Sequence, residues 1–452
     1  KRIIGLVAEI NAGSEKFAFV ETYGCAQNVN DCERLLGMLE EMGYKKTDDK
    51  NKADVIIYNT CAVRENAELK VFGNIGALKA LKRAKPSLII GVCGCMMQQE
   101  HIVEQIKKRY KHVDIVFGTH SLYRFPEIFY NAENFHERVI EFVNEDGNIA
   151  ENLPMHRDNS PLAGVSVMYG CNNFCTYCIV PYVRGRERSR MKEDIMKEVK
   201  NLAENGVKEI MLLGQNVNSY GKDIDGYIDF PDLLNEVSKA DGIERIRFMT
   251  SHPKDLSDKL IDVMAQNKKV CKQLHLPIQC GSDKILKAMN RKYTSEQYLE
   301  KIRKVKEKIP NVTLTTDIIV GFPGEDNDDF EHTMEVLKTV RYDSVFSFIY
   351  SKRHGTPAEK MEDVLTKEEK KKNFDRMLEL QNIISAEKNK EYDGKEFDIL
   401  VEGESKTNPD FMTGRTDGGK IVNFKGEKSL VGKIVRVKIT NAHTWSLSGE
   451  LV

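Results

Sequence analysis

The 452-residue sequence lacks any apolar run long enough to cross a membrane. A membrane-spanning helix needs about 18 or more predominantly apolar residues in a row. We also expect no signal peptide, because the apolar stretch at residues 3–8 is short and is broken by Glu9. We therefore expect a protein that works in the cytoplasm and has no membrane partner.

The sequence also lacks a large excess of either charge. Lys and Arg number 68 and Asp and Glu number 69, which gives a net charge of −1. Because nucleic-acid-binding domains usually carry a basic excess, this balance counts against a general affinity for RNA. Any case for RNA binding must therefore depend on local clusters of basic residues.

Without a secretion signal, the ten cysteines are not expected to form a disulfide framework, since the cytosol keeps thiols reduced. A group of cysteines in such a protein indicates metal or redox chemistry. The ten are Cys25, Cys32, Cys61, Cys93, Cys95, Cys171, Cys175, Cys178, Cys271 and Cys280.

The length suggests about three domains, and the first domain shows alternating strand and helix patterns. This alternation predicts a parallel α/β sheet with crossover helices. We expect a tail at residues 1–15, this α/β domain at residues 16–150, and an unpatterned tail and linker at about residues 131–159. The expected strands are residues 17–20, 55–58, 88–92 and 115–117.

A second alternation begins near Gly164, and we assign residues 157–385 to it. Six strand–helix units predict an open, partial version of the eight-fold barrel, with its chemistry at the C-terminal strand ends. The six expected strands are residues 165–169, 209–213, 245–249, 273–278, 313–320 and 344–350.

The last part of the sequence predicts a long charged helix followed by a small β domain at residues 386–452. Thr366 and Glu369 have the spacing of a capping box at the start of this helix. Short strands at residues 397–401, 421–424 and 434–439, separated by Gly-rich turns, predict an all-β barrel or sandwich.

Three cysteines with the spacing Cys-x-x-x-Cys-x-x-Cys follow the first strand of the second domain. They are Cys171, Cys175 and Cys178. Three thiolates can hold three irons of a cubane cluster and leave the fourth iron open. Zinc is the alternative, but structural zinc uses four ligands, and no fourth Cys or His lies nearby in the sequence.

A second set of cysteines follows three strands of the first domain. Cys25, Cys61 and Cys95 are 36 and 34 residues apart, which is one strand–helix unit each. Because equivalent ends of parallel strands lie at one sheet edge, we expect these thiols to converge there. Cys93 is a weaker candidate ligand, and a structural role is expected for the remaining cysteines.

Several phrases resemble the methylthiotransferase family of radical S-adenosylmethionine (SAM) enzymes, and specifically its tRNA branch. The resemblance runs from about Lys16 to the end, and its departures at Ala26, Cys32 and Cys280 involve no expected ligand. The phrases are residues 22–28 (TYGCAQN), 59–67 (NTCAVRENA), 94–96 (GCM), 178–190 (CIVPYVRGRERSR), 251–253 (SHP) and 355–358 (GTPA).

The resemblance implies an N-terminal methylthiotransferase domain, a radical SAM domain and a C-terminal TRAM barrel. It also implies two 4Fe-4S clusters, an auxiliary cluster on the first-domain cysteines and a radical cluster that binds SAM. The implied reaction adds a methylthio group to carbon 2 of an N6-isopentenyladenosine next to the anticodon of tRNA. An electron donor and iron–sulfur assembly proteins are the implied protein partners.

Two alternatives to this function stay open. The nearer one is a sister methylthiotransferase that acts on threonylcarbamoyladenosine in tRNA or on a ribosomal-protein aspartate. The farther one is a zinc-containing RNA-binding module without catalysis, which metal analysis would distinguish by zinc in place of iron and sulfide.

The resemblance also indicates where SAM should bind, near the ends of the second-domain strands. Each polar residue at these positions can also serve a turn or a helix cap. The candidate contacts are Tyr177, Gln215, Asn216, Gln279, Asp317 and Val320.

Two groups of basic residues are candidate RNA contacts. Arg184, Arg186, Arg188 and Arg190 alternate, so all four point one way if the segment is extended and spread out if it is helical. From Phe411 onward seven basic residues, including Lys433 and Arg436, stand against three acidic ones. Such a basic surface with aromatic residues suits single-stranded RNA.

Overall fold

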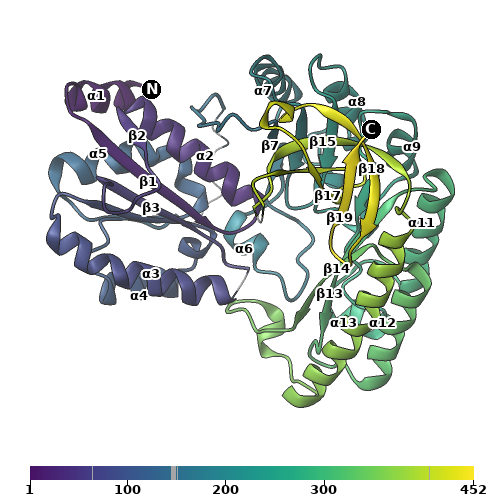
Figure 1. The fold of residues 1–452 in the computed structure, drawn as a ribbon. Helices are drawn as coiled ribbons and strands as arrows, with labels where there is room; N and C mark the ends of the chain where they lie inside the picture. The colour runs from purple at the N-terminus through teal and green to yellow at the C-terminus, as the bar shows by residue number, and fades with distance from the viewer. Residues whose placement is uncertain (64, 144–148, 150, 407) are drawn as a thin grey trace. The chain divides into compact units, whose positions relative to one another are not determined.

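The structure is a computed structural model that describes residues 1–452 except 64, 144–148, 150 and 407 (Figure 1). The chain forms two compact units. The first contains Lys1–Asp158, Tyr169–Asn172 and Cys178–Arg190, and the second contains Asn159–Met168, Asn173–Tyr177 and Met191–Val452. In the described part of the chain, no helix is long and apolar enough to span a membrane.

The first unit is built on a six-stranded sheet with the order β2-β1-β3-β4-β5-β6, whose neighbouring strands are all parallel (Figure 1). Helices α1, α2 and α5 supply one hydrophobic core, and α3 and α4 supply the core on the other face. The strands are β1 (Lys16–Tyr23), β2 (Tyr44–Lys46), β3 (Val55–Thr60), β4 (Ile89–Gly94), β5 (Ile115–Phe117) and β6 (Val139–Glu141). The helices are α1 (Arg2–Asn11), α2 (Ala26–Glu41), α3 (Glu65–Ala84), α4 (Glu100–Arg109) and α5 (Phe125–Phe135), with 3-10 turns η1 (Cys95–Gln98) and η2 (Thr119–Arg124).

The parallel sheet confirms the expected class, but two expected tails are wrong. Residues 1–15 contain helix α1, because Ile4 and Val7 pack into the core and stabilise a helix too short to be stable alone. Residues 131–159 are not all linker, since α5 continues to Phe135 and β6 adds a parallel edge strand. Residues 144–148 and 150 of this expected linker lie outside the described part.

The second unit begins with a partial barrel of six parallel strands in two sheets, β11-β10-β7 and β12-β13-β14. Its strands are β7 (Leu162–Ser166), β10 (Glu209–Leu213), β11 (Arg245–Phe248), β12 (Gln273–His275), β13 (Thr313–Val320) and β14 (Ser344–Ile349). Its helices are α7 (Lys192–Glu204), α8 (Phe230–Ser238), α9 (Asp258–Gln266), α10 (Asp283–Ala288), α11 (Ser295–Lys308), α12 (Asn327–Val340) and α13 (Lys367–Lys390). The 3-10 turns are η3 (Val217–Ser219), η4 (Pro253–Asp255) and η5 (Pro357–Lys360).

The predicted six strand–helix units are confirmed, with changes at strand ends. The expected strand 165–169 is two short strands, β7 and β8 (Met168–Tyr169), and the expected strand 273–278 shortens to β12. Helix α6 (Val180–Arg184) and strand β9 (Arg188–Ser189) occupy the arginine-rich segment. The capping box of Thr366 and Glu369 is present at the start of α13.

The C-terminal residues form a closed five-stranded barrel with the order β15-β16-β17-β19-β18, which selects the barrel over the sandwich. The strands are β15 (Glu396–Glu404), β16 (Phe411–Arg415), β17 (Ile421–Lys425), β18 (Ile434–Ala442) and β19 (Leu447–Leu451), with the turn η6 (Lys428–Leu430).

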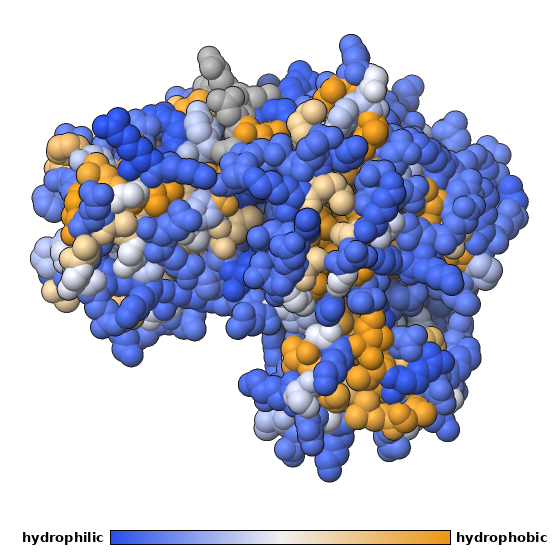
Figure 2. All heavy atoms as spheres, turned by 90° about the horizontal axis from the view of Figure 1, so that it is seen from above, coloured by the Kyte–Doolittle hydropathy of each residue, from blue (hydrophilic) through white to orange (hydrophobic). Residues whose placement is uncertain are grey.

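Hydrophilic side chains dominate the protein surface seen from above, with hydrophobic patches between them (Figure 2).

Candidate active site

Three cysteines of the first unit follow three neighbouring strands at one edge of the sheet. Cys25 stands two residues after β1, while Cys61 and Cys95 directly follow β3 and β4. In the sheet register Tyr23 is opposite Thr60, and Thr60 is opposite Gly94. The three strand ends are therefore level, as their spacing in the sequence predicts.

A close approach of the backbone brings Cys95 to this edge. Gly94 has a φ of +97°, and a Cβ there would lie 2.3 Å from Asn59 Oδ1 and 2.6 Å from the Thr60 carbonyl oxygen. Only glycine fits this position without displacing its neighbours. The turn that precedes Cys95 is therefore a requirement of the site.

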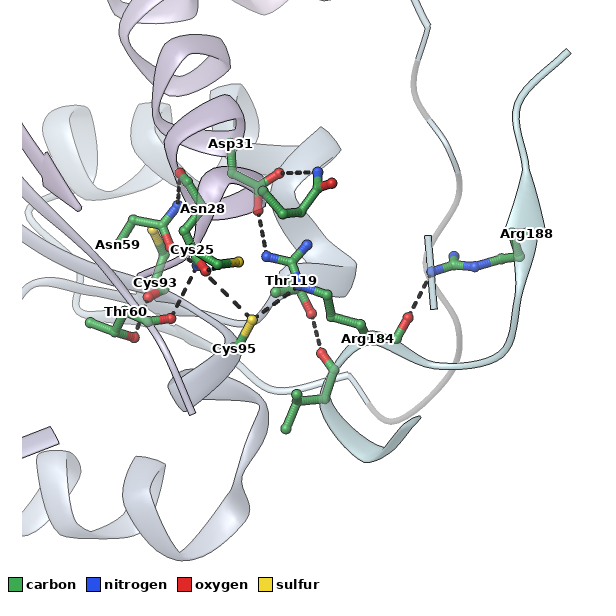
Figure 3. A network of polar contacts seen from close by, with 12 residues as sticks. Cys25, Asn28, Asp31, Asn59, Thr60, Cys93, Cys95, Thr119, Arg184 and Arg188 are labelled. Carbon is green, nitrogen blue, oxygen red and sulfur yellow. Dashed lines mark hydrogen bonds and ion pairs between the residues drawn. The ribbon is translucent and has the colours of Figure 1, made fainter. Parts of the chain in front are cut away.

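Asn28 at the start of α2 links the cysteine-bearing turns (Figure 3). Its amide nitrogen donates to Asn59 Oδ1 at 2.8 Å and lies 4.0 Å from Cys95 Sγ. The Cys25 thiol lies 3.3 Å from Asn28 Oδ1. One buried amide thus contacts two of the three cysteines and holds the turn between them.

The electrostatic surroundings of these thiols fit a metal cluster. Burial raises the pKa of Cys95 to about 12; the Arg184 guanidinium opposes this shift, while Cys61 and Cys25 add to it. Cys61 and Cys95 are buried and Cys25 is exposed. Thiols that are close enough to influence one another become thiolates when cationic irons replace their protons. In the described part of the chain no three Cys, His, Asp or Glu side chains are grouped to hold one metal ion. That finding is compatible with a cubane, because its thiolates bind separate irons.

The other cysteines of the first unit do not join this group. Cys93 is 1% exposed and packs in the core on the α1, α2 and α5 side of the sheet. Burial raises the pKa of Cys32 to about 12. The expectation that Cys32 is structural agrees with its position on α2, and Cys93 is better explained as a core residue than as a ligand.

The second cysteine set lies in one eight-residue segment, at positions 171, 175 and 178. Before it, Gly170 has a φ of +76°, and a Cβ there would lie 1.9 Å from the Arg186 carbonyl oxygen. The Cys171 amide donates to the Gly185 carbonyl oxygen at 3.1 Å. The backbone at Cys171 is thus packed tightly against the segment that follows helix α6.

Cys175 belongs to the second unit, where α10 and the residues after it hold its loop. The Thr176 hydroxyl donates to the Ala288 carbonyl oxygen at 2.9 Å, and Asn290 Nδ2 donates to the Phe174 carbonyl oxygen at 2.9 Å. Arg291 Nη1 donates to Cys175 Sγ at 3.4 Å. No motif in the sequence indicated Arg291, since 116 residues separate it from Cys175.

Two of the candidate SAM contacts, Gln279 and Asp317, lie close together in the second unit. Gln279 has a φ of +74°, and its backbone N–H donates to the backbone carbonyl oxygen of Asp317 at 2.9 Å, so the backbones of these two residues lie side by side. Asp317 Oδ2 also lies 3.5 Å from His275 Nε2. His275 stands on β12 and Asp317 on β13, and Gln279 follows β12 and bridges to Ile318, so these residues can orient a polar ligand.

The remaining candidate contacts are engaged within the protein or half-buried. Asn216 Nδ2 donates to Asp255 Oδ2 at 2.8 Å, and Val320 lies in the hydrophobic core. The Tyr177 ring meets Phe322 edge-on at 6.4 Å between centroids. Gln215 is half-buried. Val320 is the weakest candidate, because its side chain is already fully packed.

The interpretation of four alternating arginines as one RNA-facing row is wrong. Arg184 ends helix α6 and is 5% exposed, and Arg190 is 3% exposed and forms hydrogen bonds of 2.7 and 2.6 Å with Glu151. Buried arginines with protein partners cannot form a surface row for phosphates. Arg186 is exposed and Arg188 is half-buried, so of the four arginines only these two remain candidates for RNA contact.

The basic residues expected on the barrel are at its surface. Lys433 and Arg436 are both exposed, and Arg436 Nη1 lies 3.0 Å from Asp398 Oδ1. An exposed ion pair of this kind is weak and can exchange its carboxylate for a phosphate. The positions are accessible to RNA, and the contacts themselves stay predictions.

Family models match three parts of the chain. Residues 165–337 match the Radical SAM superfamily, residues 17–118 match Uncharacterized protein family UPF0004, and residues 390–452 match the TRAM domain.

Proteins described as tRNA-2-methylthio-N(6)-dimethylallyladenosine synthase are similar along nearly the whole chain. One from Acetivibrio thermocellus is 58% identical over 98% of this chain and 92% of its own length. One from Alkaliphilus oremlandii is 56% identical over 98% of this chain and 94% of its own length. The radical S-adenosylmethionine methyltransferase TsrM from Kitasatospora setae shares the fold, with a TM-score of 0.56, 14% identity, and coverage of 76% of this chain and 75% of its own.

Proposed function

Because the chain belongs to the tRNA-2-methylthio-N(6)-dimethylallyladenosine synthase family, within the Radical SAM superfamily, we propose that it adds a methylthio group to carbon 2 of an N6-isopentenyladenosine. The base lies next to the anticodon in tRNA. The observation that carries this proposal is the 58% identity across 98% of the chain. The two cysteine sets, each with the surroundings of a cluster, support it.

We assign two 4Fe-4S clusters to the cysteines. Cys171, Cys175 and Cys178 hold the radical cluster, and the sheet-edge cysteines Cys25, Cys61 and Cys95 hold the auxiliary cluster. With SAM bound, these groups supply the radical and sulfur chemistry that the protein side chains lack.

The protein's own groups position the cluster ligands and the cofactor. Arg291 fixes Cys175, while Asp317 on β13 and Gln279 after β12, which are joined by a backbone hydrogen bond, supply polar side chains for the cofactor. Asn28 and Gly94 hold the auxiliary thiols at the sheet edge. Such preorganisation matters because a misplaced radical would react with the protein or with solvent.

The alternatives are less well supported. A sister methylthiotransferase for threonylcarbamoyladenosine or a ribosomal-protein aspartate is disfavoured. Eight relatives at 53–58% identity are all described as tRNA-2-methylthio-N(6)-dimethylallyladenosine synthase. A zinc RNA-binding module is disfavoured by the radical SAM match over residues 165–337.

The proposed substrate implies the partners and the place of action. The TRAM match and the exposed Lys433 and Arg436 favour the C-terminal barrel as one tRNA-binding surface, with Arg186 and Arg188 as further contacts. An electron donor and iron–sulfur assembly proteins are required for two reducible clusters. We place the reaction in the cytoplasm, where tRNA is modified and thiols stay reduced.

The test is the mass of the product from reduced, reconstituted enzyme. It is supplied with SAM, a sulfide source and tRNA that carries N6-isopentenyladenosine. Matched reactions contain tRNA with threonylcarbamoyladenosine or a ribosomal protein. A methylthio mass increase on the isopentenylated nucleoside alone is expected. An increase only on one of the other substrates would replace the proposal with the sister activity.

A further inference from the structure

Arg184 is buried between one proposed cluster ligand and one carboxylate (Figure 3). Its Nε donates to Cys95 Sγ at 3.1 Å, and its Nη2 donates to Asp31 Oδ2 at 2.9 Å. The side chains of Arg184 and Asp31 are each 6% exposed. The guanidinium therefore has two defined partners and is almost fully buried.

The neighbouring contacts hold this guanidinium in one place. The Thr119 hydroxyl donates to the Val183 carbonyl oxygen at 2.5 Å, and Arg188 Nη2 donates to the Arg184 carbonyl oxygen at 3.2 Å. These bonds fix the end of helix α6 on both sides of the Arg184 side chain. The direction of the Nε–H group toward the sulfur is thus determined by the backbone as well as by Asp31.

Burial of an arginine destabilises a protein unless the surrounding groups compensate for the loss of hydration. Removing a guanidinium from water costs several kcal/mol, and one carboxylate repays this only in good geometry. Asp31 balances the charge through Nη2, and Cys95 Sγ accepts from the Nε–H group that Asp31 does not reach. A thiolate that binds iron gains the most from such a donor, because it carries the charge that the N–H group attracts.

We infer that Arg184 positions Cys95 and tunes the auxiliary cluster, with its Nε–H donating to the ligand sulfur and Asp31 holding the guanidinium. The inference rests on the proposed function, which assigns that cluster to Cys25, Cys61 and Cys95. Hydrogen bonds to cluster sulfurs and nearby charge set the reduction potential. A cationic donor stabilises the more negative, reduced cluster, so Arg184 raises the potential.

The test measures the midpoint potential of the auxiliary cluster in the full-length chain. Cys171, Cys175 and Cys178 are all replaced by Ala, so that only one cluster contributes to a potentiometric titration followed by electron paramagnetic resonance. Arg184→Gln in this background is expected to shift the midpoint to a more negative potential. Arg184→Lys, which keeps the charge, is expected to recover part of the shift.

The matched control is Arg124→Gln, which removes the same charge from an arginine paired with Glu127 and Glu141 in the first unit. It is expected to leave the midpoint unchanged. Equal midpoints for the background and Arg184→Gln, or equal shifts in Arg184→Gln and Arg124→Gln, would overturn the inference.

A second variant covers the case in which Asp31, left unpaired, prevents Arg184→Gln from holding iron. The double variant Asp31→Asn with Arg184→Gln keeps the net charge and two polar groups of similar size. Its midpoint is also expected to be more negative than the background, and an unchanged midpoint contradicts the inference. A background chain that binds no iron would instead reject the proposed function itself.

Discussion

Arg291 Nη1 donates to Cys175 Sγ at 3.4 Å, while its Nη2 donates to the Pro277 carbonyl oxygen at 2.8 Å. Arg291 is 8% exposed, and its Nε donates to the Tyr293 hydroxyl at 2.9 Å. The same relationship recurs at Cys95 with Arg184. Each proposed cluster thus has at least one ligand sulfur that accepts a hydrogen bond from a buried arginine.

Arg291→Gln should weaken the radical cluster without affecting the auxiliary one. Loss of a group that orients a metal ligand typically costs about 10–100-fold in affinity or activity. We expect 5′-deoxyadenosine formation to fall by that factor, measured in reduced enzyme with SAM. Arg291→Lys should fall less, and an unaltered rate in the Gln variant would show that the contact has no role in the cluster.

Iron analysis can separate the two cysteine sets. The wild-type chain should hold about eight irons after anaerobic reconstitution, because two cubanes require them. Cys175→Ala should lose about half of this iron and all SAM cleavage. Full iron content in that variant would contradict the assignment of the second cysteine set.

Cys61→Ala should have a different phenotype, because it affects only the sheet-edge thiols. It should lose about half of the iron but still form some 5′-deoxyadenosine, while methylthiolated nucleoside disappears. Normal product formation would mean that the thiols at the sheet edge are structural. Cys93→Ala, a buried cysteine directly on β4, is the matched control that should retain iron.

Strand positions were predictable where burial made apolar runs long, as in β3, β4 and β13. The helix α1 and the edge strands β2 and β6 were missed or misread, because short elements depend on packing that a local pattern does not contain. The cysteine sets were predictable from their repeated position after strands. Their arginine partners were not, because 89 residues separate Cys95 from Arg184.

Glu325 should make stability depend on pH. Burial raises its pKa to about 7, although the backbone N–H groups of Gly321 and Phe322 oppose this shift; Asp329 adds to it and Lys370 reduces it. A raised carboxyl pKa means that the folded state favours the protonated form. The stabilisation that the protonated Glu325 carboxyl gives the folded state is therefore complete below the pKa of this group in the unfolded chain. It is lost as the pH rises through about 7.

Glu325→Gln should remove this dependence, because its amide oxygen can still accept from the Gly321 and Phe322 backbone N–H groups. At pH 8 the free energy of unfolding of the variant should exceed that of the wild type by on the order of 2–3 kcal/mol. Near pH 4 the two free energies of unfolding should converge. Thermal or denaturant unfolding between pH 4 and pH 8 measures the difference. Parallel stability curves for the two proteins would mean that Glu325 stays ionised in the fold.

Deletion of the C-terminal barrel is a poor test of tRNA binding, because the barrel completes a buried part of the second unit. Arg245 donates to the carbonyl oxygens of Arg415 and Asp398, both at 2.7 Å. Arg247 donates to the Thr416 carbonyl oxygen at 2.6 Å and pairs with Glu209. A chain ending near Asp393 would leave these arginines without their carbonyl acceptors, so we expect reduced stability of the partial barrel as well.

Point substitutions on the exposed barrel surface separate binding from folding. Lys433→Gln with Arg436→Gln removes two surface charges and no buried contact. If both side chains meet phosphates, tRNA affinity should fall and the log–log salt slope should flatten by about 0.7–0.9 per contact. Cofactor cleavage without tRNA should remain, because neither residue belongs to a cysteine loop. Unchanged affinity and slope in this folded variant would move the RNA site away from β18 and toward Arg186 and Arg188.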